Sequence, residues 1–276
     1  MSGRLFVVAV PIGNPDDVTV RAIATLNAVS VVAAEDTRHF RTLALRHGIE
    51  TPAVSYHDHN EESRSRELVT RLLAGDDVAL VSDAGTPLVS DPGYRLVRGA
   101  LEAGVEVTSL PGASAVTTAL AASGLPPHPF RFVGFLPRTS AARRSTLESV
   151  RDDAATLIAF EAPRRLLATL RDVLSTLGDR PACLARSITK SHEDYRRASV
   201  AALIESLERE GEVRGECTLL VGGSAERSVS VEAATADATL LLHHGTPSRA
   251  VQELLVQRHG LSKRDAYALV LAARGR

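Results

Sequence analysis

The 276-residue chain contains only two cysteines, Cys183 and Cys217. Two cysteines cannot form a disulfide framework, and these two do not have the spacing of a metal-binding pair. We therefore expect no structural metal and no disulfide-stabilised fold. Such sparse use of cysteine is typical of a reducing compartment, so we expect a cytoplasmic protein.

Long apolar runs and an excess of charge of one sign are also missing. No segment approaches the ~20 apolar residues of a membrane span, and residues 1–4 lead into a predicted strand rather than a signal peptide. The 32 Lys and Arg residues against 33 Asp and Glu residues give a formal net charge of -1. We expect no membrane partner, and nucleic acid would have to bind to a local basic patch.

Strand-like and helix-like segments alternate over residues 1–122, and 44% of all residues are hydrophobic. This alternation predicts an α/β domain whose mostly parallel sheet is covered on both faces. Asp91 and Pro92 are predicted to be the N-cap and first residue of a helix that stops near Gly104. The candidate strands are residues 5–10, 30–34, 53–56, 78–81 and 105–109.

A proline-rich break at residues 123–129 marks the predicted domain boundary, since three prolines in four positions continue neither a helix nor a central strand. Residues 123–223 are predicted to form a second α/β domain. Its candidate strands are residues 131–135, 156–160, 182–187 and 218–221, and its candidate helices are residues 140–151, 163–177 and 200–210.

Residues 224–276 are predicted to combine a linker with a small helical domain. The linker is a Ser-, Ala- and Glu-rich stretch over residues 222–237, and helices are predicted over residues 248–259 and 263–273. Ser262 can cap the second of these. Two helices joined by a short turn resemble a helix-turn-helix. Lys263 and Arg264 make this tail locally basic; it could engage RNA, or be a docking hairpin with solvated charges.

Three turns rich in small residues and proline follow predicted strands: VPIGN at 10–14, SDAGTP at 82–87 and LPGAS at 110–114. Because parallel strands end at one edge of a sheet, these turns are expected to build one site. None has the pattern of a phosphate-binding loop, and their prolines remove N–H donors. The turns favour a small neutral or zwitterionic cofactor, with Asp83 available to an amine or hydroxyl group.

Further motifs follow in order: AEDTR at 34–38, HDHNE at 57–61, SDAGTPLVSDPG at 82–93, GFLP at 134–137, EAPRR at 161–165, TK at 189–190 and RGE at 214–216. Together with the three turns, this set resembles the bacterial 16S ribosomal RNA cytidine 2′-O-methyltransferases of the tetrapyrrole methylase superfamily. Two positions depart from the family pattern. Ser187 stands where the family usually has Glu, and Ala113 where it usually has Pro.

The resemblance implies a fold and a reaction. It implies two α/β domains of the tetrapyrrole methylase type, a cofactor cleft between them and a helical tail that engages RNA. It further implies a homodimer that uses S-adenosylmethionine to methylate the ribose 2′-hydroxyl of a decoding-centre cytidine, in free 16S ribosomal RNA or in the small ribosomal subunit. Two alternatives stay open: a methyltransferase of the superfamily acting on a small macrocycle, and a non-catalytic RNA- or ribosome-binding module.

The motif match also implies the cofactor contacts. Phe160 and Cys217 are added because each lies at the end of a predicted strand of the second domain. The full set of expected cofactor contacts is Pro11, Gly13, Asp83, Gly85, Thr86, Ser114, Ala115, Phe160 and Cys217.

Attack by a ribose hydroxyl calls for a nearby proton acceptor. Lys190 is a candidate because only it and Lys263 are lysines among the 32 basic residues, so a retained lysine points to an amine that loses its proton or acts as a point charge. Asp36 could instead cap the helix that follows it. The expected catalytic residues are Asp36, Glu161 and Lys190, with the imidazoles of His57 and His59 as further candidate bases.

Arginines and one histidine are the candidate contacts to RNA. Arg138, Arg143 and Arg144 could also follow a phosphate backbone, although charge runs commonly form solvated helix faces. The expected substrate-binding residues are Arg38, His57, Arg164, Arg165, Lys263 and Arg264.

Overall fold

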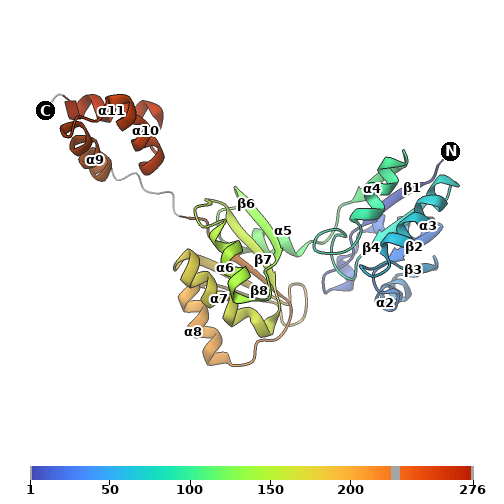
Figure 1. The fold of residues 1–276 in the computed structure, drawn as a ribbon. Coiled ribbons are helices and arrows are strands. Elements are labelled where there is room, and N and C mark those ends of the chain that lie inside the picture. The colour runs from blue at the N-terminus through green and yellow to red at the C-terminus, as the bar shows by residue number, and fades with distance from the viewer. Residues whose placement is uncertain (1, 225–230, 275–276) are drawn as a thin grey trace.

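The computed structural model describes residues 2–224 and 231–274 (Figure 1). Two five-stranded sheets, each with its own helices, follow one another along the chain, and a group of three helices comes last. This arrangement confirms the predicted fold class of two α/β units with a helical tail.

The first sheet has the strand order β3-β2-β4-β1-β5, and all its strands are parallel. Alternate residues of each strand point to opposite faces, so Val32 packs with α1 and α2 whereas Val31 packs with α3 and α4. The helices thus cover both faces, as predicted. The elements are β1 (Arg4–Val8), α1 (Val20–Ala28), β2 (Val31–Ala34), α2 (Thr37–His47), β3 (Ala53–Ser55), α3 (Glu61–Leu73), β4 (Val78–Val81), α4 (Tyr94–Glu102) and β5 (Glu106–Leu110), with a 3-10 turn η1 (Pro15–Asp17) after β1.

The three glycine- and proline-containing turns meet at one edge of this sheet. Val10 and Gly85 exchange two backbone hydrogen bonds, of 2.9 and 3.0 Å, which join the turns after β1 and β4. The Thr86 hydroxyl donates to the Ala113 carbonyl at 3.2 Å and so joins the turn after β5. The prediction that the three turns lie together is confirmed.

The second sheet has the order β6-β7-β10-β8-β9, in which only the β6–β7 pair is parallel. Strand β9 was not predicted, because its sequence DYRRAS lacks an apolar run; it lies at the edge of the sheet, where arginine side chains reach solvent. The elements are β6 (Phe130–Phe135), α6 (Ser140–Glu148), β7 (Thr156–Glu161), α7 (Pro163–Leu177), β8 (Pro181–Arg186), β9 (Asp194–Ser199), α8 (Val200–Glu210) and β10 (Cys217–Val221).

Helix α5 (Ala115–Ser123) connects the two sheets along the chain. Its buried side chains Val116, Ala119 and Leu120 share a core with Ile158 and Leu220 of the second sheet. We propose that the first domain ends before α5, rather than at the break after residue 122. The proline-rich segment interrupts the secondary structure, but this packing assigns α5 to the second sheet.

The tail consists of α9 (Val231–His243), α10 (Ser248–His259) and α11 (Lys263–Arg274), packed around their own apolar core. The predicted linker was wrong for residues 231–237, which belong to α9; its residues 225–230 lie outside the described part of the chain. The fully buried residues of α9 are the small Ala234 and Ala238, and its large apolar contacts, Leu241 and Leu242, come only in its last turn, so the apolar periodicity typical of a helix is weak. As predicted, Ser262 caps α11, accepting a hydrogen bond of 3.1 Å from the Asp265 backbone.

No helix in residues 2–224 or 231–274 combines the length and the apolar character needed to cross a membrane.

Candidate active site

A cavity of about 390 Å³ lies between the turns of the first sheet and the carboxyl end of β7. Phe160 forms part of its wall and is held edge-on by Phe132 and Phe135, at ring-centroid distances of 4.9 and 5.5 Å. We call it the Phe160 cavity. Its volume falls within the range of small-molecule sites, and both sheets contribute to its wall.

A second cavity, of about 430 Å³, adjoins the first. Lys190 lines it together with residues of α2, including His39 and Thr42, and we call it the Lys190 cavity. The two cavities share Ile12, Ala84 and Glu216 in their walls. Two ligands bound in these cavities would therefore lie side by side, next to these three shared residues.

Lys190 stands beside that wall, in contact with Glu216. Its ammonium nitrogen lies 3.0 Å from the Glu216 carboxylate, and 38% of its side chain is exposed. The Asn14 backbone N–H donates to the Thr189 hydroxyl at 2.9 Å, so the loop after β8 touches the loop after β1. A Cβ atom at Gly13 would lie only 2.7 Å from the Lys190 Cγ atom. Glycine at position 13 is thus what lets the two loops approach.

Ser187 packs against the loop that carries Glu216. Its backbone N–H donates to the Glu216 carbonyl at 3.0 Å, and its hydroxyl oxygen occupies the place where a Cβ atom at Gly215 would stand. Gly215 also has a φ of +85°. A carboxylate therefore stands beside Lys190, from Glu216, although residue 187 is a serine.

The expected cofactor contacts divide between the two cavities. Pro11, Gly13 and Asp83 line the Lys190 cavity instead of the Phe160 cavity. Burial raises the pKa of the Cys217 thiol to about 11. The thiol is therefore uncharged at neutral pH, and Cys217 lines the cavity as a small neutral side chain and not as a nucleophile. The residues that do line the Phe160 cavity are Gly85, Thr86, Ser114, Ala115, Phe160 and Cys217.

Asp83 also joins the loops after β2 and β4. Its carboxylate accepts a hydrogen bond of 3.0 Å from the Asp36 backbone, and its own N–H donates to the Glu35 carboxylate at 3.2 Å. These reciprocal bonds fix both loops against each other at the edge of the sheet.

Asp36 caps α2 and pairs with Arg38. Its carboxylate accepts from the Arg38 backbone at 2.8 Å and lies 2.7 Å from the Arg38 guanidinium. Hydrogen bonds from Arg38 hold the pKa of Asp36 well below its usual range. A carboxylate with so low a pKa is a weak proton acceptor. The geometry therefore favours the capping alternative over a role as catalytic base.

Glu161 is fully enclosed, with an exposed side-chain fraction of 0%. Its carboxylate lies 2.9 Å from the Arg165 guanidinium and accepts a hydrogen bond of 2.5 Å from the Thr169 hydroxyl. Arg165 also donates to the Leu136 carbonyl at 2.6 Å. The Glu161 carboxylate and the Arg165 guanidinium are thus bound to partners inside the protein. This favours a positioning role at the end of β7, instead of proton transfer by Glu161 or RNA contact by Arg165.

The remaining basic candidates fall into three groups. Arg143 is buried and pairs with Asp172, so its prediction as a phosphate contact was wrong. His57 and His59 follow β3 and do not occur among the described residues that line the two cavities. The exposed candidates are Arg38, Arg138, Arg144, Arg164, Lys263 and Arg264.

Asp91 lines the Phe160 cavity and was missed as a site residue. It was predicted to cap a helix, but α4 begins at Tyr94, after Gly93. Burial raises the pKa of Asp91 to about 7, and the nearby carboxylate of Glu35 adds to this effect. The sequence feature that could have shown this is Gly93. Its φ of +140° is a conformation that favours glycine, and it places Asp91 and Pro92 before the start of the helix.

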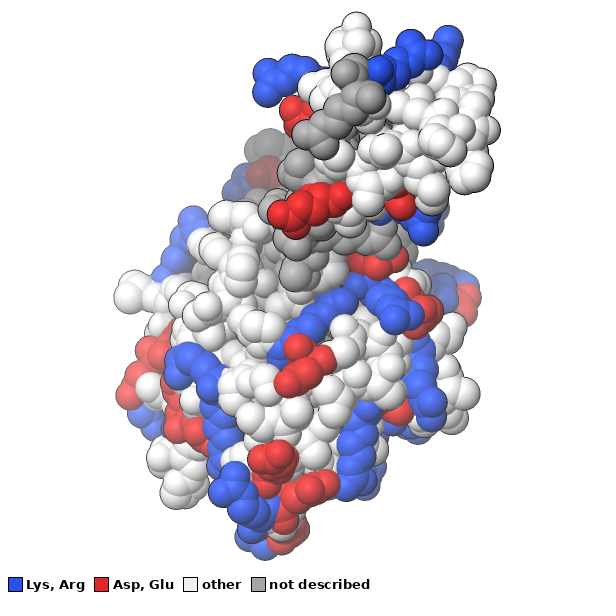
Figure 2. All heavy atoms as spheres, turned by 90° about the vertical axis from the view of Figure 1, so that its left-hand side faces the viewer, with Lys and Arg blue, Asp and Glu red and all other residues white. Residues whose placement is uncertain are grey.

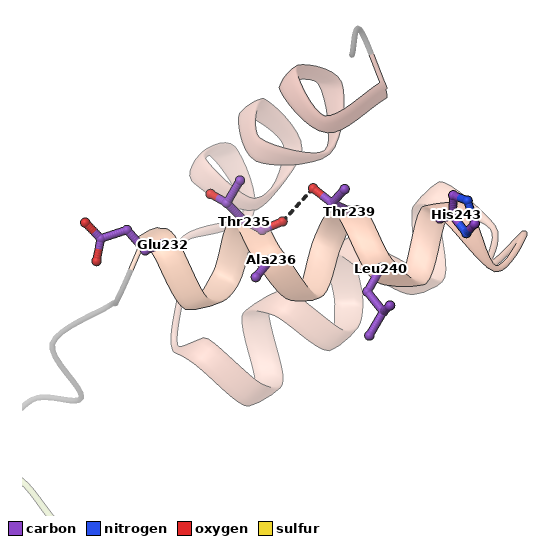
Figure 3. A pocket seen from close by; sticks show the side chains of 6 residues that line it. All are labelled: Glu232, Thr235, Ala236, Thr239, Leu240 and His243. Carbon is purple, nitrogen blue, oxygen red and sulfur yellow. Dashed lines mark hydrogen bonds between the residues drawn. The ribbon is translucent and has the colours of Figure 1, made fainter.

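Two further surfaces lie outside these cavities. A shallow cavity of about 650 Å³ runs along α9, where Leu240 and His243 lie among small side chains (Figure 3). On the face in Figure 2, basic and acidic side chains are interspersed and form no continuous basic patch. Within residues 2–224 and 231–274, no cluster of three His, Cys, Asp or Glu side chains is arranged to hold a metal ion.

The sequence is similar to a known protein family and, over nearly its whole length, to named relatives. Residues 4–204 match the family described as Tetrapyrrole (Corrin/Porphyrin) Methylases. A "Ribosomal RNA small subunit methyltransferase I" from Micromonospora olivasterospora is 51% identical, covering 99% of this chain and 88% of that protein. One of the same name from Pseudomonas aeruginosa is 43% identical over 100% of this chain and 99% of its own length.

Solved structures resemble the fold as well. A uroporphyrin-III C-methyltransferase from Thermus thermophilus, in complex with S-adenosyl homocysteine, matches with a TM-score of 0.56 and 25% identity, over 80% of this chain and 97% of its own. A diphthine synthase matches with a TM-score of 0.63 and 16% identity, over 81% of this chain and 91% of its own.

Proposed function

Because the chain belongs to the tetrapyrrole methylase family of S-adenosylmethionine-dependent methyltransferases, we propose that it methylates the ribose 2′-hydroxyl of a cytidine in 16S ribosomal RNA. The names of its relatives support ribosomal RNA of the small subunit as the substrate. The single observation that carries the mechanism is the wall shared by two adjacent cavities, at which Lys190 and Glu216 stand.

The Phe160 cavity suits S-adenosylmethionine in size and chemistry. It combines apolar and aromatic walls at Ala115 and Phe160 with the hydroxyl groups of Thr86 and Ser114, and it lacks the features of a triphosphate site. When bound, the cofactor supplies an activated methyl group on a sulfonium centre. We assign Gly85, Thr86, Ser114, Ala115, Phe160 and Cys217 to its binding.

The Lys190 cavity is the proposed place of the acceptor nucleotide. His39 and Thr42 offer polar groups, and Phe40 and Pro11 offer apolar surface against a base or ribose. Methyl transfer is an in-line displacement, so holding the two reactants at the shared wall supplies much of the rate enhancement, of up to roughly 7–11 kcal/mol. Gly13 and Asp83 shape this cavity by fixing the loops after β1 and β4.

Lys190 is the proposed catalytic residue. The hydroxyl must lose a proton as it attacks. As the ammonium paired with Glu216, Lys190 stabilises the negative charge that develops on the oxygen, and its amine can receive the proton once the ammonium has passed its own proton to Glu216 or to water. Glu216 orients the amine through the ion pair of 3.0 Å. Asp36 and Glu161 serve to position the loops around this centre, since both carboxylates are bound to arginines.

The proposed reaction is tested with labelled S-adenosylmethionine and small ribosomal subunits that lack the modification. We expect label in 16S ribosomal RNA, recovered as 2′-O-methylcytidine after nuclease digestion and mass spectrometry. Label on a base, or tight binding of the cofactor with no transfer to either free RNA or subunits, would contradict the proposal.

The helical tail is proposed to contact RNA phosphates through Lys263 and Arg264, both exposed on α11. Replacing both by alanine is expected to weaken subunit binding and to flatten its dependence on salt. Each lost phosphate contact lowers the slope of log affinity against log salt concentration by about 0.7. The measurement is a titration at several salt concentrations. Arg66→Ala, which removes an exposed arginine paired with Glu62, is the control; equal slopes for all three proteins would remove the tail from RNA binding.

We further propose that the enzyme works as a homodimer in the cytoplasm, where small ribosomal subunits occur. Exposed apolar side chains support an interface between copies: Tyr94 and Leu101 on α4 are 64% and 59% exposed. Sedimentation equilibrium of the full chain tests this, and a monomer at micromolar concentration would contradict it.

A further inference from the structure

Three carboxylates line the Phe160 cavity: Asp91, Glu161 and Glu216. Glu161 is neutralised by Arg165 and Glu216 by Lys190, at distances of 2.9 and 3.0 Å. The ion pairs of residues 2–224 and 231–274 do not include Asp91, whose hydrogen-bond partner is the uncharged Ser82 hydroxyl. The cavity therefore contains one carboxylate that no cation of the protein balances.

The backbone next to Asp91 adopts an unfavourable conformation. Leu88 and Ser90 have φ angles of 73° and 71°, a conformation that non-glycine residues rarely adopt. The Ser90 hydroxyl lies 3.3 Å from where a Cβ atom at Gly134 of β6 would stand. The segment between β4 and α4 thus reaches across to the second sheet, and Asp91 lines the cavity between them.

We propose that Asp91 is the carboxylate that receives a positive charge of S-adenosylmethionine. This assignment rests on the proposed function and names a binding residue that the sequence motif had suggested only as a helix cap. The cofactor carries two cations, the sulfonium and the α-ammonium group, against one carboxylate of its own, so it brings one unbalanced positive charge into a cavity whose other two carboxylates are already paired. The cofactor would then complete a charge balance that the protein leaves open.

Charges around Asp91 give the proposal a measurable signature. Burial, with the carboxylates of Glu35, Asp83 and Asp58, raises the pKa of Asp91 to about 7. Across the cavity stand Glu161 with Arg165 and Glu216 with Lys190. A bound cation stabilises the ionised form, so binding expels the proton that Asp91 carries below its raised pKa. Affinity for the cofactor must therefore rise with pH.

The test is isothermal titration calorimetry of the full chain with S-adenosylmethionine between pH 6 and 8. For a group with a pKa near 7, affinity is expected to rise about tenfold over this interval, with release of about half a proton per cofactor at pH 7. Proton release is read from titrations in buffers of different ionisation enthalpy. In Asp91→Asn, which keeps an acceptor for Ser82, we expect weaker binding, a flat pH profile and no proton release.

Asp58→Asn is the matched control. It removes an exposed carboxylate that acts on Asp91 only through its charge, so the tenfold rise should persist, displaced to slightly lower pH. S-adenosylhomocysteine lacks the sulfonium charge; a pH profile present for both ligands assigns Asp91 to the ammonium, and one present for S-adenosylmethionine alone assigns it to the sulfonium.

Three outcomes separate this assignment from the proposed function. An Asp91→Asn protein with the affinity and pH profile of the wild type would overturn the assignment, while methyl transfer to ribosomal RNA could still proceed. Loss of turnover at saturating cofactor with unchanged affinity would overturn it too, placing Asp91 in the chemistry. A wild-type chain that binds the cofactor but methylates no RNA would contradict the proposed function and leave the pH test of Asp91 intact.

Discussion

Replacing Lys190 by alanine is expected to reduce methyl transfer by about 10²–10⁴-fold, the usual contribution of a positioned acid or base. Lys190 lines the Lys190 cavity beside the shared residue Glu216, where its ammonium can stabilise the attacking oxygen and, after giving up its own proton, its amine can take up that of the hydroxyl. Affinity for S-adenosylmethionine should change little, because Lys190 does not line the Phe160 cavity. Single-turnover rates at saturating cofactor and RNA measure the effect.

Two further variants show what Lys190 contributes. Lys190→Arg keeps the positive charge but cannot release a proton at neutral pH; near-normal turnover would assign the residue a purely electrostatic role, and turnover as low as in the alanine variant would assign it proton transfer. Arg171→Ala removes a cation whose partner, Glu208, lies 2.6 Å away on α8, and neither residue lines either of the two cavities. If Arg171→Ala loses as much turnover as Lys190→Ala, the effect of Lys190 is not specific.

Gly13→Ala is the second change with a large expected effect, of about 10²-fold in kcat/KM, the scale that a misplacement of roughly 1 Å can produce. Its new Cβ atom would lie 2.7 Å from the Lys190 Cγ atom, 2.8 Å from the Thr189 hydroxyl and 2.9 Å from the Ile188 carbonyl. The loop after β8 must therefore shift, and it takes Lys190 with it. The measurement is steady-state kinetics on small subunits.

Gly99→Ala in α4 is the control for this change. A Cβ atom there meets Val69 at 3.5 Å, which is ordinary van der Waals contact, and alanine favours a helix over glycine by about 1 kcal/mol. We expect normal activity and unchanged or slightly higher thermal stability. Full activity in Gly13→Ala would show that the loops tolerate separation and that the position of Lys190 is less critical than proposed.

The sequence predicted the first sheet well because its central strands are short apolar runs, fully buried in β2 and β4 and mostly buried in β1. It predicted two other elements less well: β9 of the second sheet carries charged side chains at an edge, and the fully buried residues of α9 in the tail are the small Ala234 and Ala238. Apolar periodicity reports burial of large side chains. This periodicity does not reveal a strand whose side chains are solvated or a helix that packs through alanine.

The turns were located correctly, but the state of each charged group could not be predicted. Asp36 is neutralised by Arg38 and Glu161 by Arg165, and both pairings depend on rotamers rather than on residue type. The division of Asp83 and Gly85 between two cavities depends on how the loops cross the edge of the sheet. Asp91 was missed because Asp-Pro before a predicted helix is a common capping pattern, which explains both residues without a role in ligand binding.

Glu216 has a consequence for how the two ligands influence each other. Its side chain belongs to the walls of both cavities, so whichever ligand arrives first alters the surroundings that the other meets. Such a shared wall gives the two sites a coupling free energy, and thermodynamic reciprocity requires that the methyl donor change the affinity for RNA by the same factor as RNA changes the affinity for the donor. The order in which the ligands bind is then set by their concentrations in the cell as much as by the protein.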